Sequence, residues 1–108
     1  MSEPIQVFMT AGDKEEAQRI AQAIVEQRLA ACVQVLGPIY SSYWWEDELE
    51  TAEEYLCLMK SDRRVYDELE AAIKKVHSYD TPEILAMPVT AGNPDYLQWL
   101  QQELKQGS

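Results

Sequence analysis

Two extended segments, Ala31 to Trp45 and Glu48 to Lys60, meet at a short acidic turn and predict a long β-hairpin in a chain of 108 residues. Strands in globular proteins average about 5 to 6 residues, whereas the longer arm, at about 3.3 Å per residue, would reach roughly 45 to 50 Å. A compact domain of this length has a radius of gyration near 13 Å and is only about 35 Å wide. The hairpin must therefore project from the domain.

The projecting part of this hairpin is rich in aromatic side chains. Large exposed apolar patches are uncommon on soluble monomers, so we expect other copies of the chain, or a partner, to cover it. The pair Gly37-Pro38 interrupts the first arm and predicts a β-bulge or a bend. The aromatic residues are Tyr40, Tyr43, Trp44, Trp45 and Tyr55.

The remaining elements follow from hydrophobic periodicity and helix caps. Asp13 and Glu16 fit a capping box at the start of the first helix. The order of elements predicts one domain over residues 1–108, an α+β ferredoxin-like βαββαβ sandwich with four antiparallel strands, helices on one face and an extra C-terminal helix. The predicted elements are a strand over Pro4 to Thr10, a helix from Asp13 to Leu29, a helix from Ser61 or Asp62 to about His77, a strand over Glu83 to Val89 and a helix from Pro94 to Leu104.

Composition excludes several classes of partner. The formal net charge of −10 repels phosphate backbones and anionic lipids, so neither nucleic acid nor a membrane is expected as a partner. The longest apolar stretch, Leu29 to Leu36, is too short to span a bilayer, and the first residues carry no export signal, which predicts a cytoplasmic protein. Cys32 and Cys57 are then expected as reduced thiols, with Cys32 opposite a residue near position 62 in the hairpin.

Polar residues gather in the segment from His77 to Glu83, between the second helix and the last strand. His77, the only histidine, is either a metal ligand or proton carrier, or a cation that satisfies the last carbonyls of the helix. Glu83 is expected to begin a central, buried strand, where a carboxylate needs a partner such as Lys60, Arg28 or His77. Arg28 is expected in the last turn of the first helix, where it complements the helix dipole.

The sequence carries none of the common catalytic or nucleotide-binding motifs. The only histidine, His77, lies next to neither Cys32 nor Cys57 in the sequence, and no serine or cysteine nucleophile with a positioned base is identifiable. We therefore expect no enzyme activity and no catalytic residues. A small hydrolase with His77 as base and Glu83 as its orienting group is the minor alternative.

Four segments follow one another along the chain in a distinctive order: Glu26-Gln27-Arg28-Leu29-Ala30-Ala31-Cys32-Val33, Tyr43-Trp44-Trp45 to Leu49-Glu50, His77-x-Tyr79-x-x-Pro82-Glu83-Ile84 and Tyr96-Leu97-x-Trp99. Together they resemble the CutA family, whose members are named for divalent-cation tolerance. The resemblance covers nearly all of the chain and is most specific in the first and third segments.

The resemblance implies a tight homotrimer in which the long hairpins run between subunits, and a cleft between subunits that could hold a small ligand. Lys60, Tyr79 and Trp99 match the polar cluster of the family near that cleft, together with His77 and Glu83.

Binding of Cu²⁺ or another divalent cation is implied through a cysteine of the first strand, a loop histidine and the glutamate of the Pro-Glu motif. In this chain His77 and Glu83 match the last two, whereas Met9 stands at the cysteine position, His77-Ser78 replaces His-Pro and Asp47 replaces a turn glycine. A thioether binds Cu(I) but is a poor ligand for Cu²⁺ or Zn²⁺.

These observations lead to two hypotheses about function. The first is a non-enzymatic, cytoplasmic homotrimer involved in divalent-cation (copper) tolerance, with weak metal or small-ligand binding near His77 and Glu83. The second is a trimeric signalling or scaffold protein, similar to the nitrogen-regulatory trimers, that binds an anionic small effector or a protein in the cleft through Lys60 and Arg28.

Overall fold

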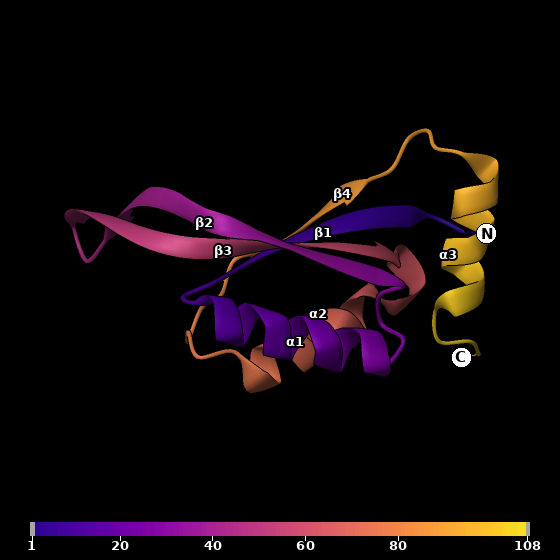
Figure 1. Ribbon diagram of the computed structural model, residues 1–108, viewed down its shortest axis with the longest axis horizontal. Coiled ribbons are helices and arrows are strands. Elements are labelled where there is room, and N and C mark those ends of the chain that lie inside the picture. The colour runs from indigo at the N-terminus through magenta and orange to yellow at the C-terminus, as the bar shows by residue number, and fades with distance from the viewer. Residues whose placement is uncertain (1, 108) are drawn as a thin grey trace.

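The structure is a computed structural model that describes residues 2–107. Within these residues the predicted order of strands and helices is confirmed, and a short 3₁₀ turn precedes the second helix (Figure 1). The elements are β1 (Pro4–Ala11), α1 (Lys14–Glu26), β2 (Cys32–Trp45), β3 (Glu48–Asp62), η1 (Arg63–Val65), α2 (Tyr66–Val76), β4 (Ile84–Pro88) and α3 (Pro94–Glu103).

The four strands form one antiparallel sheet in the order β2-β3-β1-β4. The expectation that the last strand is central and begins at Glu83 is wrong, because β4 lies at the sheet edge and begins at Ile84. One side of β1 is taken by the long strand β3, so β4 can pair only with the other side of β1. Glu83 consequently lies outside the sheet and is exposed.

The hairpin of β2 and β3 projects from the rest of the chain, as predicted (Figure 1). It makes the molecule 44 × 27 × 22 Å, with a radius of gyration of 14.5 Å, somewhat above the value of about 13 Å for a compact chain of this length. Its tip is a two-residue turn in which Glu46 and Asp47 have φ angles of 50° and 64°. Two positive φ values are typical of the type I′ turn, whose twist matches that of the flanking strands.

The predicted bulge at Gly37-Pro38 is confirmed, since the register of the hairpin shifts between Leu36 and Ile39. The predicted register is wrong by two residues, because Cys32 pairs with Lys60. One residue of this difference arises because the turn is centred between positions 46 and 47. The other is the extra residue that the bulge inserts into β2.

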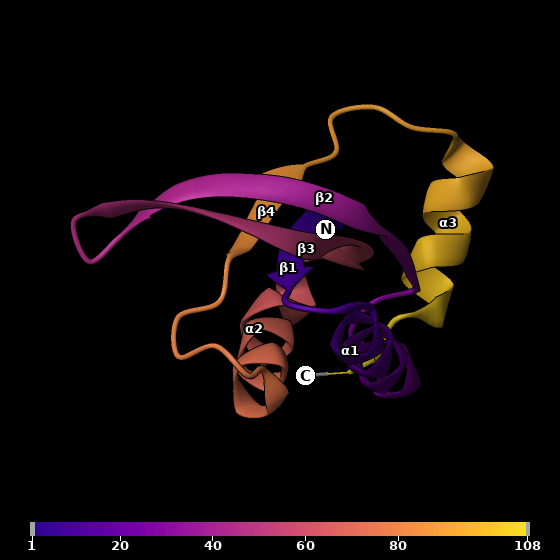
Figure 2. The ribbon, with the colours of Figure 1, turned by 60° about the vertical axis from the view of Figure 1, so that its left-hand side comes forward.

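The two long helices cover one face of the sheet, and α3 packs across the sheet's end (Figures 1 and 2). Ile5, Val7 and Met9 alternate along β1 toward α1 and α2 and are buried. Leu100 and Leu104 of the C-terminal segment complete this core. None of the helices in residues 2–107 is long and apolar enough to cross a membrane.

The opposite face of the sheet is apolar and open. Phe8 pairs with Leu58 on one side and with Leu85 on the other, and Leu85 is 51% exposed. In the projecting part of the hairpin Tyr40 and Trp44 are 74% and 72% exposed. The predicted exposure of aromatic residues on the projecting part of the hairpin is therefore confirmed for Tyr40, Tyr43, Trp44 and Trp45.

Candidate functional site

His77 ends α2 and anchors the following loop to β1. Its Nε2 lies 2.8 Å from the carbonyl oxygen of Thr10, and its Nδ1 accepts a hydrogen bond of 3.0 Å from the backbone N–H of Tyr79. The carbonyl requires a donor and the N–H requires an acceptor, so the ring is the neutral tautomer with its proton on Nε2. His77 is only 9% exposed and offers no free lone pair to a cation in this conformation.

Glu16 of α1 holds the same loop from the other side. Its carboxylate accepts hydrogen bonds from the backbone N–H of Ser78 at 2.7 Å and from the Ser78 hydroxyl at 2.9 Å. The predicted capping box is half confirmed, because Asp13 accepts from the N–H of Glu16 while the Glu16 carboxylate turns to Ser78. The 3.8 Å separation between Glu16 and His77 Nδ1 is not an ion pair, since Nδ1 carries no proton.

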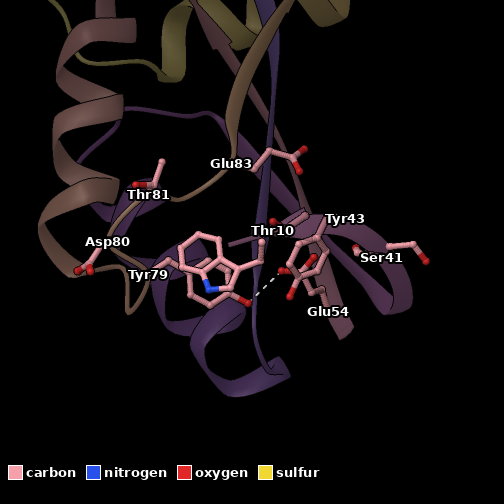
Figure 3. Close-up of a pocket in the computed structure, with 10 residues that line it drawn as sticks. Thr10, Ser41, Tyr43, Glu54, Tyr79, Asp80, Thr81 and Glu83 are labelled. Carbon is pink, nitrogen blue, oxygen red and sulfur yellow. Dashed lines mark hydrogen bonds between the residues drawn. The ribbon is translucent and has the colours of Figure 1, made fainter. Parts of the chain in front are cut away.

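Tyr79 links this loop to the hairpin. Its hydroxyl donates a 2.9 Å hydrogen bond to Oε2 of Glu54 on β3 (Figure 3), and Glu54 is 7% exposed. Partial burial, this hydrogen bond and the negative charge of Glu54 raise the pKa of Tyr79 to about 12. The phenol therefore stays protonated at neutral pH and remains a donor to the carboxylate.

A cavity of about 650 Å³ lies between the loop and the hairpin (Figure 3). Its lining combines carboxylates and aromatic rings with the hydroxyls of serines and threonines. No lysine, arginine or histidine side chain of residues 2–107 lines it. The carboxylates belong to Glu54, Asp80 and Glu83, and the aromatic rings to Tyr43, Trp45 and Tyr79.

Two of the predicted site residues, Tyr79 and Glu83, lie in the wall of this cavity. His77 does not line it and is connected to it only through its bonds to Thr10 and Tyr79. The expected buried ion pair of Glu83 is wrong, because Glu83 is exposed and takes part in no salt bridge within the described chain.

Lys60 and Trp99 do not line this cavity in one protomer. Lys60 Nζ donates to the side chain of Gln34 at 2.9 Å. Trp99 lies on α3 against Tyr96, with ring centroids 5.5 Å apart.

Arg28 lies in neither the predicted position nor the cavity. The helix α1 ends at Glu26, and Arg28 follows it with a φ of 58°. The N–H groups of Arg28 and Leu29 donate to the carbonyls of Val25 and Ile24, which is the pattern of a Schellman motif. The helix stops here because this turn directs Leu29 into the core, and the Arg28 guanidinium reaches Glu103 instead.

Sequence reasoning missed Glu16 and Glu54. Glu16 did carry a signal, because it precedes Ile20 and Ile24 by one and two helical turns and so occupies the buried face of α1. Glu54 carried none, since its acidic neighbours at the hairpin look the same in the sequence. Its partner, Tyr79, is 25 residues away.

Known proteins share both this sequence and this fold. The sequence model described as CutA1 divalent ion tolerance protein matches residues 5–103. The chain belongs to the CutA1 divalent ion tolerance family. The resemblance predicted from the four sequence segments is thus confirmed.

Individual relatives agree over most of the chain. The divalent-cation tolerance protein CutA of Pectobacterium atrosepticum is 42% identical over 97% of this chain and 96% of its own length. The chloroplastic protein CutA 1 of Oryza sativa is 38% identical over 94% of this chain, which spans only 58% of that relative. The crystal structure of CutA1 from Oryza sativa matches with a TM-score of 0.95 at 37% identity, over 97% of this chain and 96% of the rice chain.

Proposed function

We propose that this CutA1 family member acts in divalent-cation tolerance as a ferredoxin-like homotrimer that binds a small ligand and catalyses no reaction. The cavity between the hairpin and the loop after α2 is the proposed binding site. The observation that supports this best is that the projecting part of the hairpin both lines the cavity and exposes aromatic surface that a neighbouring copy would cover. The cytoplasm is the proposed location.

The proposal of a trimer is supported by two exposed apolar surfaces on one chain. The hairpin exposes 72% of Trp44 and 66% of Leu49, and the open sheet face exposes Leu85 and Met87. Burial of apolar surface contributes roughly 25 cal/mol per Å², so association that covers both surfaces is favourable.

Light scattering coupled to size exclusion tests the trimer directly, with an expected mass of about three times 12.4 kDa. Trp44→Ala should shift the mass toward the monomer on dilution. Val76→Ala removes a comparably exposed apolar side chain from α2 and should leave the mass unchanged. A wild-type mass of one chain at micromolar concentration would overturn the proposal.

The described residues do not form a metal centre in one protomer, since no group of three or more His, Cys, Asp or Glu side chains among them could hold a metal ion. Met9, at the position of the family's cysteine, is fully buried. We therefore propose that Cu²⁺ or another divalent cation binds only weakly, through the exposed carboxylate of Glu83. The role of His77 as a ligand stays a prediction that requires its ring to leave Thr10.

Calorimetric titration with Cu²⁺ and Zn²⁺ tests whether Glu83 or His77 binds the cation. Glu83→Gln should weaken the cation affinity, whereas His77→Asn should leave it within about twofold. A large loss of affinity in His77→Asn, with an unchanged far-UV spectrum, would show instead that the histidine leaves Thr10 to bind the cation.

The alternative of an anionic effector finds less support at this cavity. Its lining has three carboxylates and, among residues 2–107, no basic side chain, whereas Lys60 and Arg28 bind Gln34 and Glu103 elsewhere. Thermal-shift measurements with matched anionic and cationic compounds discriminate the two, because a ligand that binds only the folded protein raises its Tm.

A further inference from the structure

We infer that the cavity between the hairpin and the loop after α2 is a site for a small organic ammonium ion, with Glu54 as the counter-ion and aromatic rings as the walls. This inference rests on one part of the proposed function, namely that this cavity binds a small ligand, and it adds the chemical class of that ligand. It does not depend on the trimer or on the binding of a metal ion.

The first observation is the incomplete pairing of Glu54. The side chain is 7% exposed, and within residues 2–107 it has one hydrogen bond, from the neutral hydroxyl of Tyr79 to Oε2. Glu54 lines the cavity, and no side-chain oxygen among the described residues is both fully buried and without a hydrogen-bond partner, so Oε1 keeps access to solvent. A largely buried carboxylate is costly unless it is paired with charge and fully hydrogen-bonded. A cationic donor in the cavity would supply both.

The second observation is the kind of wall that surrounds this carboxylate. Tyr43, Trp45 and Tyr79 line the same cavity, and tyrosine and tryptophan faces attract ammonium groups through their ring quadrupoles. Figure 3 shows the hydroxyl of Tyr79 directed at Glu54, so the ring and the counter-ion are held together. Aromatic walls next to a carboxylate recognise the apolar body and the charge of one ligand at the same time.

The size and charge of the cavity argue against the other ligand classes. A volume of about 650 Å³ is in the range of small-molecule sites, roughly 300 to 1,000 Å³. A tightly held divalent ion instead needs several oxygen ligands within about 2.0 to 2.6 Å, and the described residues contain no group of three or more His, Cys, Asp or Glu side chains that could hold one. An anion would meet Asp80 and Glu83 as well as Glu54.

Tyr79 strengthens the site as a neutral donor. Because its pKa is raised to about 12, it does not add a second negative charge or lose its hydrogen bond to Glu54 at neutral pH. The net charge of −10 also raises the local concentration of cations around the chain.

The test compares three probes of one shape on the full-length chain: 2-phenylethylammonium, the neutral 2-phenylethanol and the anionic 3-phenylpropionate. Affinities are measured by calorimetry and by the change in tryptophan fluorescence, to which Trp45 in the wall of the cavity contributes. We expect the ammonium to bind at least tenfold more tightly than the alcohol and the anion not to bind. Equal affinities for the ammonium and the alcohol would overturn the inference.

Two neighbouring glutamates provide a matched pair of variants. Glu54→Gln removes the charge but retains an oxygen that can accept from Tyr79, and it should weaken ammonium binding at least tenfold. Glu53→Gln removes the same charge from an exposed position that does not line the cavity, and affinity should stay within twofold. Undiminished binding to Glu54→Gln would refute the role of this carboxylate.

A third variant covers the case in which Glu54→Gln disturbs folding. Trp45 is 57% exposed on the hairpin, and Trp45→Leu should weaken ammonium binding several-fold without a change in far-UV circular dichroism. The mass of the assembly and its Zn²⁺ affinity are recorded on the same samples. If the mass and the Zn²⁺ affinity are as proposed while no probe binds, the inference fails and the proposed function stands.

Discussion

The carboxylate of Glu16 should contribute more to stability than a glutamate in the first turn of a helix usually does. It is 5% exposed and accepts two hydrogen bonds from Ser78, at 2.7 and 2.9 Å. Glu16→Ala leaves the backbone N–H of Ser78 without an acceptor, and hydrogen bonds to charged groups contribute about 1.5 to 3 kcal/mol each. The Ser78 hydroxyl is near solvent and can bind water instead. The loss of stability should therefore correspond to one hydrogen bond, the one from the Ser78 backbone N–H.

The matched control for this substitution is Glu15→Ala. Both glutamates lie in the first turn of α1, but Glu15 is exposed. Each substitution therefore loses a similar favourable interaction with the helix dipole, about 0.3 to 1 kcal/mol, and gains the same helix propensity. The difference between the two variants isolates the contact with Ser78, and we expect it to be about 1.5 to 3 kcal/mol.

Urea unfolding, followed by far-UV circular dichroism, measures this difference. All variants must be compared at one chain concentration, because association makes the midpoint depend on concentration. Glu16→Gln should fall between the wild type and Glu16→Ala, since an amide oxygen still accepts one hydrogen bond. If Glu16→Ala and Glu15→Ala agree within about 0.5 kcal/mol, a difference of the size of ordinary surface effects, the Glu16 contact does not stabilise the loop.

Three further predictions concern a phenol, a thiol and a glycine. A titration followed by phenolate absorbance should show Tyr79 ionising near pH 12, and this ionisation should be missing in Tyr79→Phe. The protonated phenol therefore stabilises the fold fully below the ordinary pKa of 10.0, and this stabilisation is lost as pH rises toward 12. Burial raises the pKa of Cys57 to about 11, so iodoacetamide at mildly alkaline pH should leave Cys57 unmodified in the native protein, and peptide mass spectrometry showing it labelled as fast as Cys32 would contradict this. In Gly37→Ala the new Cβ would overlap the ring of Tyr55. We expect the free energy of unfolding to fall by about 1 to 3 kcal/mol, as it does in other overpacked variants. An unchanged urea midpoint would show that the ring moves aside.

The hairpin could be predicted because its signals are local. The alternation on either side of Glu46 and Asp47 defines both arms, and the Gly37-Pro38 pair marks the bulge without reference to any distant residue. The same holds for β1, where buried and partly buried residues alternate. This alternation follows from the geometry of the strand itself, so it can be read from the sequence and is found again in the structure.

The edge position of β4 could not be predicted in this way. A short apolar run such as Ile84 to Pro88 has the same pattern in a central strand and in a partly covered edge strand. Its position was decided by the pairing of β1 with β3, a contact between segments about 50 residues apart such as Met9 and Cys57. The error placed Glu83 in the core, whereas it lies in the wall of the cavity.

The role of His77 was hidden for a different reason. Both of its partners, the carbonyl of Thr10 and the N–H of Tyr79, are backbone groups. Every residue has backbone groups, so no pattern of side chains in the sequence distinguishes a histidine that is hydrogen-bonded to the backbone from one that is free to bind a metal ion. The loop motif therefore marks a segment that lies beside the cavity, but it does not reveal that Glu54 of the hairpin also lines the cavity.

The hairpin joins the two proposed properties of this protein, association and ligand binding. Tyr43 and Trp45 line the cavity, while Trp44 between them is exposed at 72% and is available to a neighbouring copy. Successive side chains of a strand point to opposite faces, so a change in the hairpin's position moves both surfaces together. Coupling between two binding equilibria is reciprocal. If assembly fixes the hairpin in the conformation that closes the cavity, assembly increases the affinity of the cavity for its ligand. A bound ligand must then increase the association constant of the chains by the same factor.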